Sequence, residues 1–178
     1  LSWEILGAFT DAAVQAGIER TDDFNGGDNA GIGYFEVNQR SGWRWNTSKA
    51  FLRPVQDRAN LTVWTESQVE KLTLQGTQCT GAVVNRAGQS IAVHATREVI
   101  SCAGAIGSPQ ILQLSGIGPR ELLEQHGIEV AVELPGVGQN LQDHLQIRAV
   151  YKVKNVKTLN TMANSLLGKL KIGMEYVF

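Results

Sequence analysis

The stretch Gly104-Ala105-Ile106-Gly107-Ser108-Pro109-Gln110-Ile111-Leu112-Gln113-Leu114-Ser115-Gly116-Ile117-Gly118 decides how this chain folds. Small residues, Cys102-Ala103-Gly104-Ala105, lead into it after the apolar segment Glu98-Val99-Ile100-Ser101. We predict that residues 98–101 form a short strand buried on both faces. The helix that follows is predicted to begin at Ser108-Pro109 and to end at Gly116.

The small side chains at 102–105 have two interpretations. Where side chains almost vanish, a ligand or another segment of backbone can approach closely. Open α/β sheets bind ligands beyond the carboxyl ends of their strands, and helix N-termini favour anionic groups. The alternative is that these residues only allow tight packing of strand on helix. The residues alone leave both interpretations open.

The middle of the chain is rich in β-forming residues. Leu61-Thr62-Val63-Trp64-Thr65 is predicted as a strand. Apolar and polar residues then alternate around Leu72–Leu74, Ala82–Val84 and Ile91–Val93, and the links between them are short and contain glycine. This pattern predicts a meander of three antiparallel strands.

The flanking regions are predicted to hold shorter elements. Apolar residues at helical spacing predict a first helix that ends at Gly17, followed by a loop-rich stretch up to residue 60. Downstream we predict a helix from Pro119 to Gly127, a strand over 128–134, a turn over 135–138, a strand over 146–154 and a partly helical tail.

The composition bounds the function classes. The chain has 178 residues, 43% of them hydrophobic, with a net charge of −1, which gives no electrostatic case for nucleic-acid binding. Cys79, Cys102 and three scattered histidines form no metal-binding pattern, and two such cysteines suggest a reducing compartment. Neither end has the features of a natural terminus, so we expect an internal piece of a longer protein.

Three stretches, in order, resemble the glucose–methanol–choline (GMC) oxidoreductases. Residues 104–118 are similar to the family's second signature: small residues, Ser-Pro, an aliphatic pair and Ser-Gly-aliphatic-Gly. Residues 134–144, LPGVGQNLQDH, resemble its V-G-x-N-L-x-D-H segment. Residues 22–26 together with 42–52 resemble the loop before the strand that contacts adenine.

The resemblance implies a mixed α/β (α+β) fold. It implies part of a Rossmann-like FAD-binding domain with an antiparallel β-meander, plus part of a substrate or lid domain. Residues 1–60 are then a lid and loop region, residues 61–144 part of the FAD-binding domain, and residues 145–178 the start of the substrate-binding domain.

The same resemblance implies the cofactor contacts. It places Val69 where a backbone amide and carbonyl meet the adenine of FAD, and Cys102, Ala103 and Gly104 where the chain passes the adenosine half. Many members carry Ala at the position of Cys102. No catalytic or metal-binding residue is expected in this chain. The phosphate-binding glycine loop is expected before residue 1 and the histidine base after residue 178, and His144 is expected to form structural hydrogen bonds.

The implied activity is oxidation of an alcohol, choline-like or primary, by hydride transfer to FAD. The enzyme would be a dehydrogenase or an oxidase, and this piece alone is expected to be inactive. The implied partner is a small-molecule alcohol and the expected location is the cytoplasm, with membrane association of the intact protein and its oligomeric state left open. The alternative is a small non-catalytic binding or interaction domain without a redox cofactor.

Overall fold

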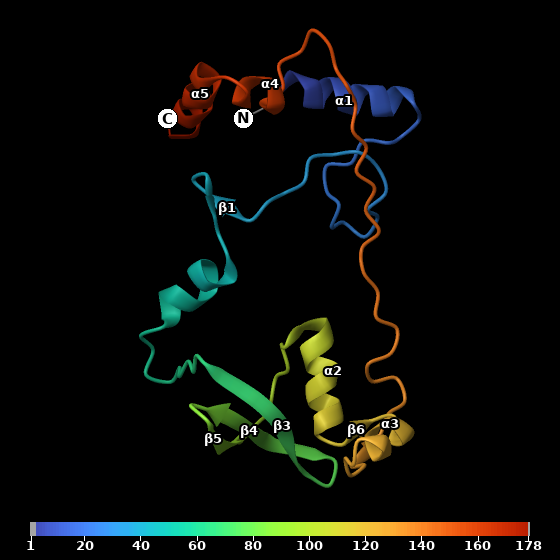
Figure 1. The fold of residues 1–178 in the computed structure, drawn as a ribbon, viewed down its shortest axis with the longest axis vertical. Helices are drawn as coiled ribbons and strands as arrows, with labels where there is room; N and C mark the ends of the chain where they lie inside the picture. The colour runs from blue at the N-terminus through green and yellow to red at the C-terminus, as the bar shows by residue number, and fades with distance from the viewer. Residues whose placement is uncertain (1–2, 178) are drawn as a thin grey trace. The chain divides into compact units, whose positions relative to one another are not determined.

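A computed structural model describes the backbone of residues 3–177 and the side chains of residues 3–174. The fold is mixed α/β, as predicted (Figure 1). Contacts divide the chain into two units: one holds the residues up to 61 and those from 148 onward, and the other runs from Thr62 to Ile147. The roles expected for 1–60, 61–144 and 145–178 stay predictions.

The second unit contains the predicted meander. Strands β3 (Ser67–Gln75), β4 (Gln78–Arg86) and β5 (Gln89–His94) pair antiparallel in the order β3-β4-β5, so β3 and β5 are the sheet's edges (Figure 1). Gly81 lies so close to β5 that a Cβ there would overlap the carbonyl oxygen of Val93. This glycine therefore allows β4 and β5 to approach closely.

Two helices follow the sheet. Helix α2 (Gly104–Leu114) precedes β6 (Ile117–Gly118), and α3 (Arg120–Gln125) precedes β7 (Val132–Glu133), which pairs parallel with β6. The predicted start of α2 at Ser108 is wrong, because the helix begins four residues earlier and Pro109 lies inside it. The chain enters α2 through Gly104, whose φ of +82° is a conformation that glycine adopts at little cost.

Three predicted strands do not form in the described chain. Residues 61–65, 98–101 and 146–154 are irregular, and the strand predicted over 128–134 is reduced to β7. A strand is stable only as part of a sheet, and no strand of the described residues forms a ladder with these segments. Ile100 was expected to be buried on both faces but is 74% exposed.

The first unit is mainly helical. Its elements are α1 (Glu4–Gln15), β1 (Gln39–Arg40), β2 (Trp43–Arg44), a π-helical turn (Ser48–Leu52), a 3₁₀ turn (Arg53–Val55), α4 (Leu159–Ala163) and α5 (Leu166–Val177). The first helix ends before Gly17, as predicted, and the tail is partly helical, as predicted. Thr158 caps α4: its Oγ1 accepts from the N–H of Thr161, and its own N–H donates to Thr161 Oγ1.

Burial is sparse in both units. Val84 in β4 and Leu123 in α3 are the buried hydrophobic side chains of the described residues. Large apolar side chains such as Ile100, Ile106 and Leu145 are exposed. Exposed apolar surface on this scale is typical of surfaces that contact other protein or a ligand. Among the described residues, every helix is too short or too polar to cross a bilayer.

Candidate cofactor-binding site

The turn before α2 exposes its main chain. Cys102, Ala103 and Gly104 are all exposed, and the thiol of Cys102 is free. A Cβ added at Gly104 would meet no atom within 4 Å. The small residue at 104 is therefore explained by its positive φ and by open space in front of it, rather than by packing against another part of the described chain.

Packing explains a different glycine of the same segment. A Cβ added at Gly107 would lie 3.1 Å from the Cβ of Ala103. The N–H of Ala103 also donates to Ser108 Oγ at 3.1 Å, which holds the turn against the first turn of the helix. Gly107 therefore packs closely against Ala103 within the turn, whereas Gly104 leaves the main chain open; close approach of a ligand there stays a prediction.

Val69 lies on the edge strand β3. It pairs with Val84 of β4 and is half-buried. The register shifts between Val69 and Lys71, so Glu70 is the extra residue of a β-bulge. Bulges occur often beside functional sites, where they change the direction of a strand and of its side chains. An edge strand also has backbone groups that its own sheet leaves unpaired. The carbonyl oxygen of Val69 itself accepts a hydrogen bond from the exposed side chain of Gln68, whose Nε2 lies 3.3 Å away.

The carboxylate of Glu70 fixes the bulge across the sheet. It accepts hydrogen bonds from Asn85 Nδ2 of β4 at 3.1 Å and from Ser90 Oγ of β5 at 2.9 and 3.1 Å. One carboxylate on β3 therefore joins all three strands next to Val69.

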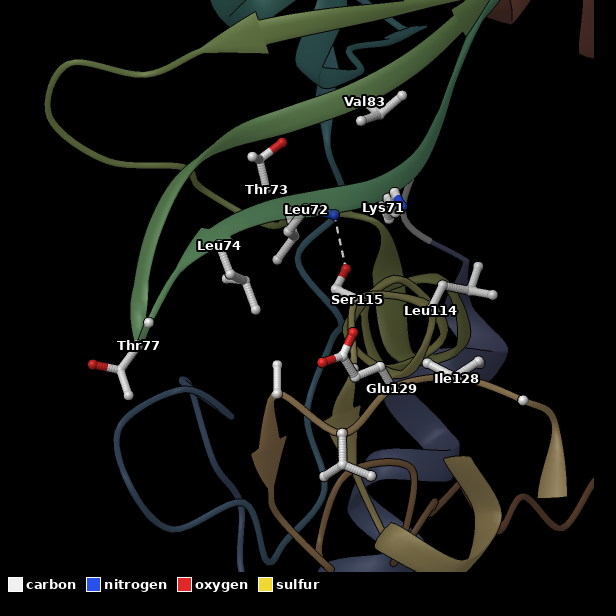
Figure 2. Close-up of a pocket in the computed structure, with 15 residues that line it drawn as sticks. Lys71, Leu72, Thr73, Leu74, Thr77, Val83, Leu114, Ser115, Ile128 and Glu129 are labelled. Atoms are coloured by element: carbon white, nitrogen blue, oxygen red, sulfur yellow. Dashed lines mark hydrogen bonds between the residues drawn. The ribbon is translucent and has the colours of Figure 1, made fainter. Parts of the chain in front are cut away.

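Ser115 joins the sheet to α2. The backbone N–H of Leu72 in β3 donates to Ser115 Oγ at 2.8 Å (Figure 2). Ser115 Oγ in turn donates to the carbonyl oxygen of Ile111. The hydroxyl uses its donor toward the helix and a lone pair toward the strand. The free edge of β3 is thereby tied to the C-terminal end of the signature helix.

A second side chain ties α2 to the turn over 135–138. Gln113 Nε2 donates to the carbonyl oxygen of Val137 at 3.1 Å. That turn was predicted from Pro135-Gly136-Val137-Gly138 and is present. The two motif segments, 104–118 and 134–144, are consequently in direct contact through a side chain that the sequence analysis did not single out.

Arg120 connects α3 to β7. Its Nε donates to Glu133 Oε2 at 3.0 Å and its Nη1 to Glu124 Oε1 at 3.3 Å. The hydrogen bonds to Glu133, then to Glu124, raise the pKa of the guanidinium. The guanidinium of Arg120 is charged throughout the physiological pH range, so its bonds to Glu133 and Glu124 do not act as a pH switch.

A cavity of about 930 Å³ lies beside the hydrogen bond between Leu72 and Ser115. Strand β3 from Lys71 to Leu74, the C-terminal end of α2 and the segment 127–131 line it. Figure 2 shows these lining residues, with Leu72 and Ser115 joined by their hydrogen bond.

The four predicted contact residues all lie in the Thr62–Ile147 unit. No hydrogen bond joins Val69 to residues 102–104 within the described part of the chain; their elements are connected through the Leu72–Ser115 bond. The roles of Val69, Cys102, Ala103 and Gly104 stay predictions.

Sequence reasoning missed Ser115, Gln113 and Glu70. For Ser115, a usable signal was a polar residue at the apolar C-terminal end of the predicted helix.

Other candidate residues, among them His144 and two tryptophans, lie outside the turn 102–104 and strand β3. Asp143 Oδ1 accepts from the backbone N–H of His144 at 2.7 Å, and Asn140 has a φ of +55°, as expected for loop residues. Trp45 lies beside Arg40 and Lys49, whose charged groups are 5.3 and 5.8 Å from its ring centre, whereas Trp43 is exposed. In the part of the chain that the structure describes, no three metal-ligating side chains gather.

The residues present fit the adenosine half of a dinucleotide. The main chain at Gly104 is open, its neighbours are small, and the edge strand that carries Val69 is held by α2. Absent side chains allow close approach of a nucleotide to backbone.

Two solved structures similar to this chain are an FAD-dependent oxidoreductase and an oxidase. An FAD-dependent oxidoreductase from Chaetomium thermophilum superposes with a TM-score of 0.73 at 32% identity, over 80% of this chain and 25% of that one. Pyridoxine 4-oxidase from Mesorbium loti gives a TM-score of 0.67 at 34% identity, over 74% of this chain and 26% of that one. The class defined by fold and site is thus the FAD-dependent oxidoreductases.

The family follows from the sequence match. The family model for GMC oxidoreductases matches residues 4–146, and the chain belongs to this family, as predicted. Oxygen-dependent choline dehydrogenase of Photobacterium profundum is 43% identical over 170 residues, covering 96% of this chain and 30% of that protein. Human mitochondrial choline dehydrogenase is 41% identical over 171 residues, covering 96% and 29%.

The chain therefore spans about a third of the length of these curated relatives. Membership of an oxidoreductase family disfavours the alternative of a non-catalytic binding domain without a redox cofactor.

Proposed function

We propose that this chain forms part of the FAD-binding region of an enzyme that oxidises an alcohol. The observation that carries the proposal is the open main chain at Gly104, which has a positive φ and no atom within 4 Å of the point where a Cβ would lie. It occurs within a chain of the GMC oxidoreductase family. Cys102, Ala103 and Gly104 would lie against the adenosine half of FAD, and the backbone of Val69 would contact the adenine.

Bound FAD would supply the hydride acceptor, and the protein would supply position and electrostatics. Three features of this chain would position the FAD: the turn 102–104, the bulged edge strand at Val69, and Ser108, whose hydroxyl accepts from the N–H of Ala103. We assign the proton acceptor to no residue of this chain.

We further propose a choline-like alcohol as substrate. The support is that relatives at 43% and 41% identity are choline dehydrogenases. A similar solved structure is a pyridoxine 4-oxidase, so pyridoxine is the informative competitor.

The experiment uses the intact protein with FAD. Purified with excess FAD, it should retain visible flavin absorbance after gel filtration, and choline should bleach that absorbance anaerobically. A protein that retains no flavin contradicts the cofactor assignment. A flavoprotein that pyridoxine bleaches and choline does not would contradict only the choice of substrate.

We also propose that the protein works in the cytoplasm. The support is that Cys79 and Cys102 are both free thiols, as is usual in reducing compartments. Fractionation of cells, followed by immunodetection, tests this location; recovery in the membrane pellet alone would contradict it.

A further inference from the structure

We infer that Ser115 is a positioning residue for the cofactor contact at Val69, an inference that rests on the proposed FAD site. The hydroxyl of Ser115 would set the path of the β3 edge, and through it the direction of the Val69 backbone. Ser115 touches neither the predicted adenine contact nor the turn 102–104 directly. Its effect on FAD is expected to act through Leu72.

The first step is the geometry of the tie. Leu72 lies on an edge strand, where a backbone N–H that does not pair with β4 needs another acceptor. Ser115 Oγ supplies it at 2.8 Å (Figure 2), and Ser115 is itself fixed because its hydroxyl donates to the carbonyl oxygen of Ile111. Because the hydroxyl has partners on both sides, it is held in one orientation and holds the strand in one place.

The second step is the distance from the tie to the contact. Val69 and Leu72 are three residues apart on one strand, which corresponds to about 10 Å. Between them lies the bulge at Glu70, where the ladder between β3 and β4 is interrupted. Where the ladder is interrupted, side-chain bonds set the path of the edge: those of Glu70 to β4 and β5, and the bond of Leu72 to Ser115 at the end of α2.

The third step is the link to the other half of the site. Ser115 directly follows α2, and α2 begins at Gly104. Through Ser115 the helix that carries the open turn is tied to the strand that carries Val69. One hydroxyl thus sets the spacing of two segments that are both predicted to contact the adenosine half of FAD.

The experiment compares four forms of the intact protein: wild type, Ser115→Ala, Ser115→Thr and Thr80→Val. Thr80→Val is the matched control, because it also removes a hydroxyl that bonds β3, at the carbonyl oxygen of Thr73, but touches neither α2 nor the bulge beside Val69. Two quantities are measured: the dissociation constant of FAD, from quenching of flavin fluorescence on adding apoprotein, and hydrogen exchange of the Leu72 amide.

Ser115→Ala should weaken FAD binding roughly tenfold and speed exchange at Leu72, since the amide loses its acceptor. Ser115→Thr keeps the hydroxyl and should restore both quantities. Thr80→Val should leave FAD affinity unchanged even where it lowers the melting temperature. Wild-type FAD affinity in Ser115→Ala, or an equal loss in Thr80→Val, would overturn the inference.

Ser115→Cys covers the case in which Ser115→Ala does not fold. A thiol of similar size is a weak hydrogen-bonding group, so a folded cysteine variant should bind FAD more weakly than wild type. Wild-type affinity in that variant overturns the inference. A wild-type protein that binds no flavin at all refutes the proposed function instead, which keeps the two failures distinct.

Discussion

The hydroxyl of Ser90 in β5 donates to the carboxylate of Glu70 in β3, lying 2.9 and 3.1 Å from its two oxygens, although β4 lies between the two strands. The bulge makes this possible, because the extra residue lies outside the regular ladder and its side chain reaches across the sheet. The bulge thus joins three strands at the position where the edge carries Val69.

Glu70→Ala should therefore destabilise the sheet. The change leaves Asn85 Nδ2 and Ser90 Oγ without their acceptor, at a cost of about 1–3 kcal/mol in the free energy of unfolding. Urea unfolding of the intact protein measures it, and Glu66→Ala, a nearby exposed carboxylate, is the control. Equal effects of the two changes would show that the hydrogen bonds contribute nothing specific.

Gly104→Ala should weaken FAD binding. An alanine at a φ of +82° costs about 1 kcal/mol or more, and its methyl group would project toward the proposed nucleotide. We expect the dissociation constant of FAD to rise at least about fivefold. Gly136→Ala is the control, because a Cβ there also meets nothing within 4 Å and its φ is not positive. If both variants bind FAD like wild type, the open turn is not a cofactor contact.

Gln113→Ala should loosen the turn over 135–138. Loss of the bond to Val137 is expected to lower the free energy of unfolding by about 1 kcal/mol. Gln110→Ala, one turn earlier on α2 and exposed, should cost much less. Thermal unfolding monitored by circular dichroism measures both, and a larger effect at Gln110 would contradict the tie.

Arg120→Met should have a small, salt-dependent effect. Both ion pairs are exposed, and surface pairs are screened by salt. Because the pKa of Arg120 is raised in the folded state, the stabilisation from its ion pairs is fully present below the ordinary pKa of arginine. This stabilisation is lost only at strongly alkaline pH. The difference in melting temperature between Arg120→Met and wild type should thus be constant between about pH 6 and 9. A difference that grows on adding salt would contradict this assignment.

The sequence predicted the parts of the fold that depend on local pattern. Alternation and short glycine-containing links identified the β3–β5 meander, and helical spacing with Gly17 identified α1. The strands expected at 61–65 and 98–101 failed because a strand depends on a partner, which local pattern does not reveal.

The site was predictable to a similar extent. Small side chains at 102–104 marked the open turn, and Val69 followed only from family resemblance. The bonds of Ser115 and Gln113 join residues 43 and 24 positions apart, so only the folded structure reveals them. The start of α2 was missed because Ser108 has the features of an N-cap, yet its hydroxyl accepts from Ala103 instead.

The exposed thiol of Cys102 offers a chemical footprint of the cofactor. It stands two residues from Gly104 on the open turn, whereas Cys79 is half-buried in β4. An alkylating reagent should label Cys102 of the apoprotein first, and occupancy by the nucleotide should shield it. Mass spectrometry of the labelled peptide would then report ligand occupancy in place, without any engineered substitution.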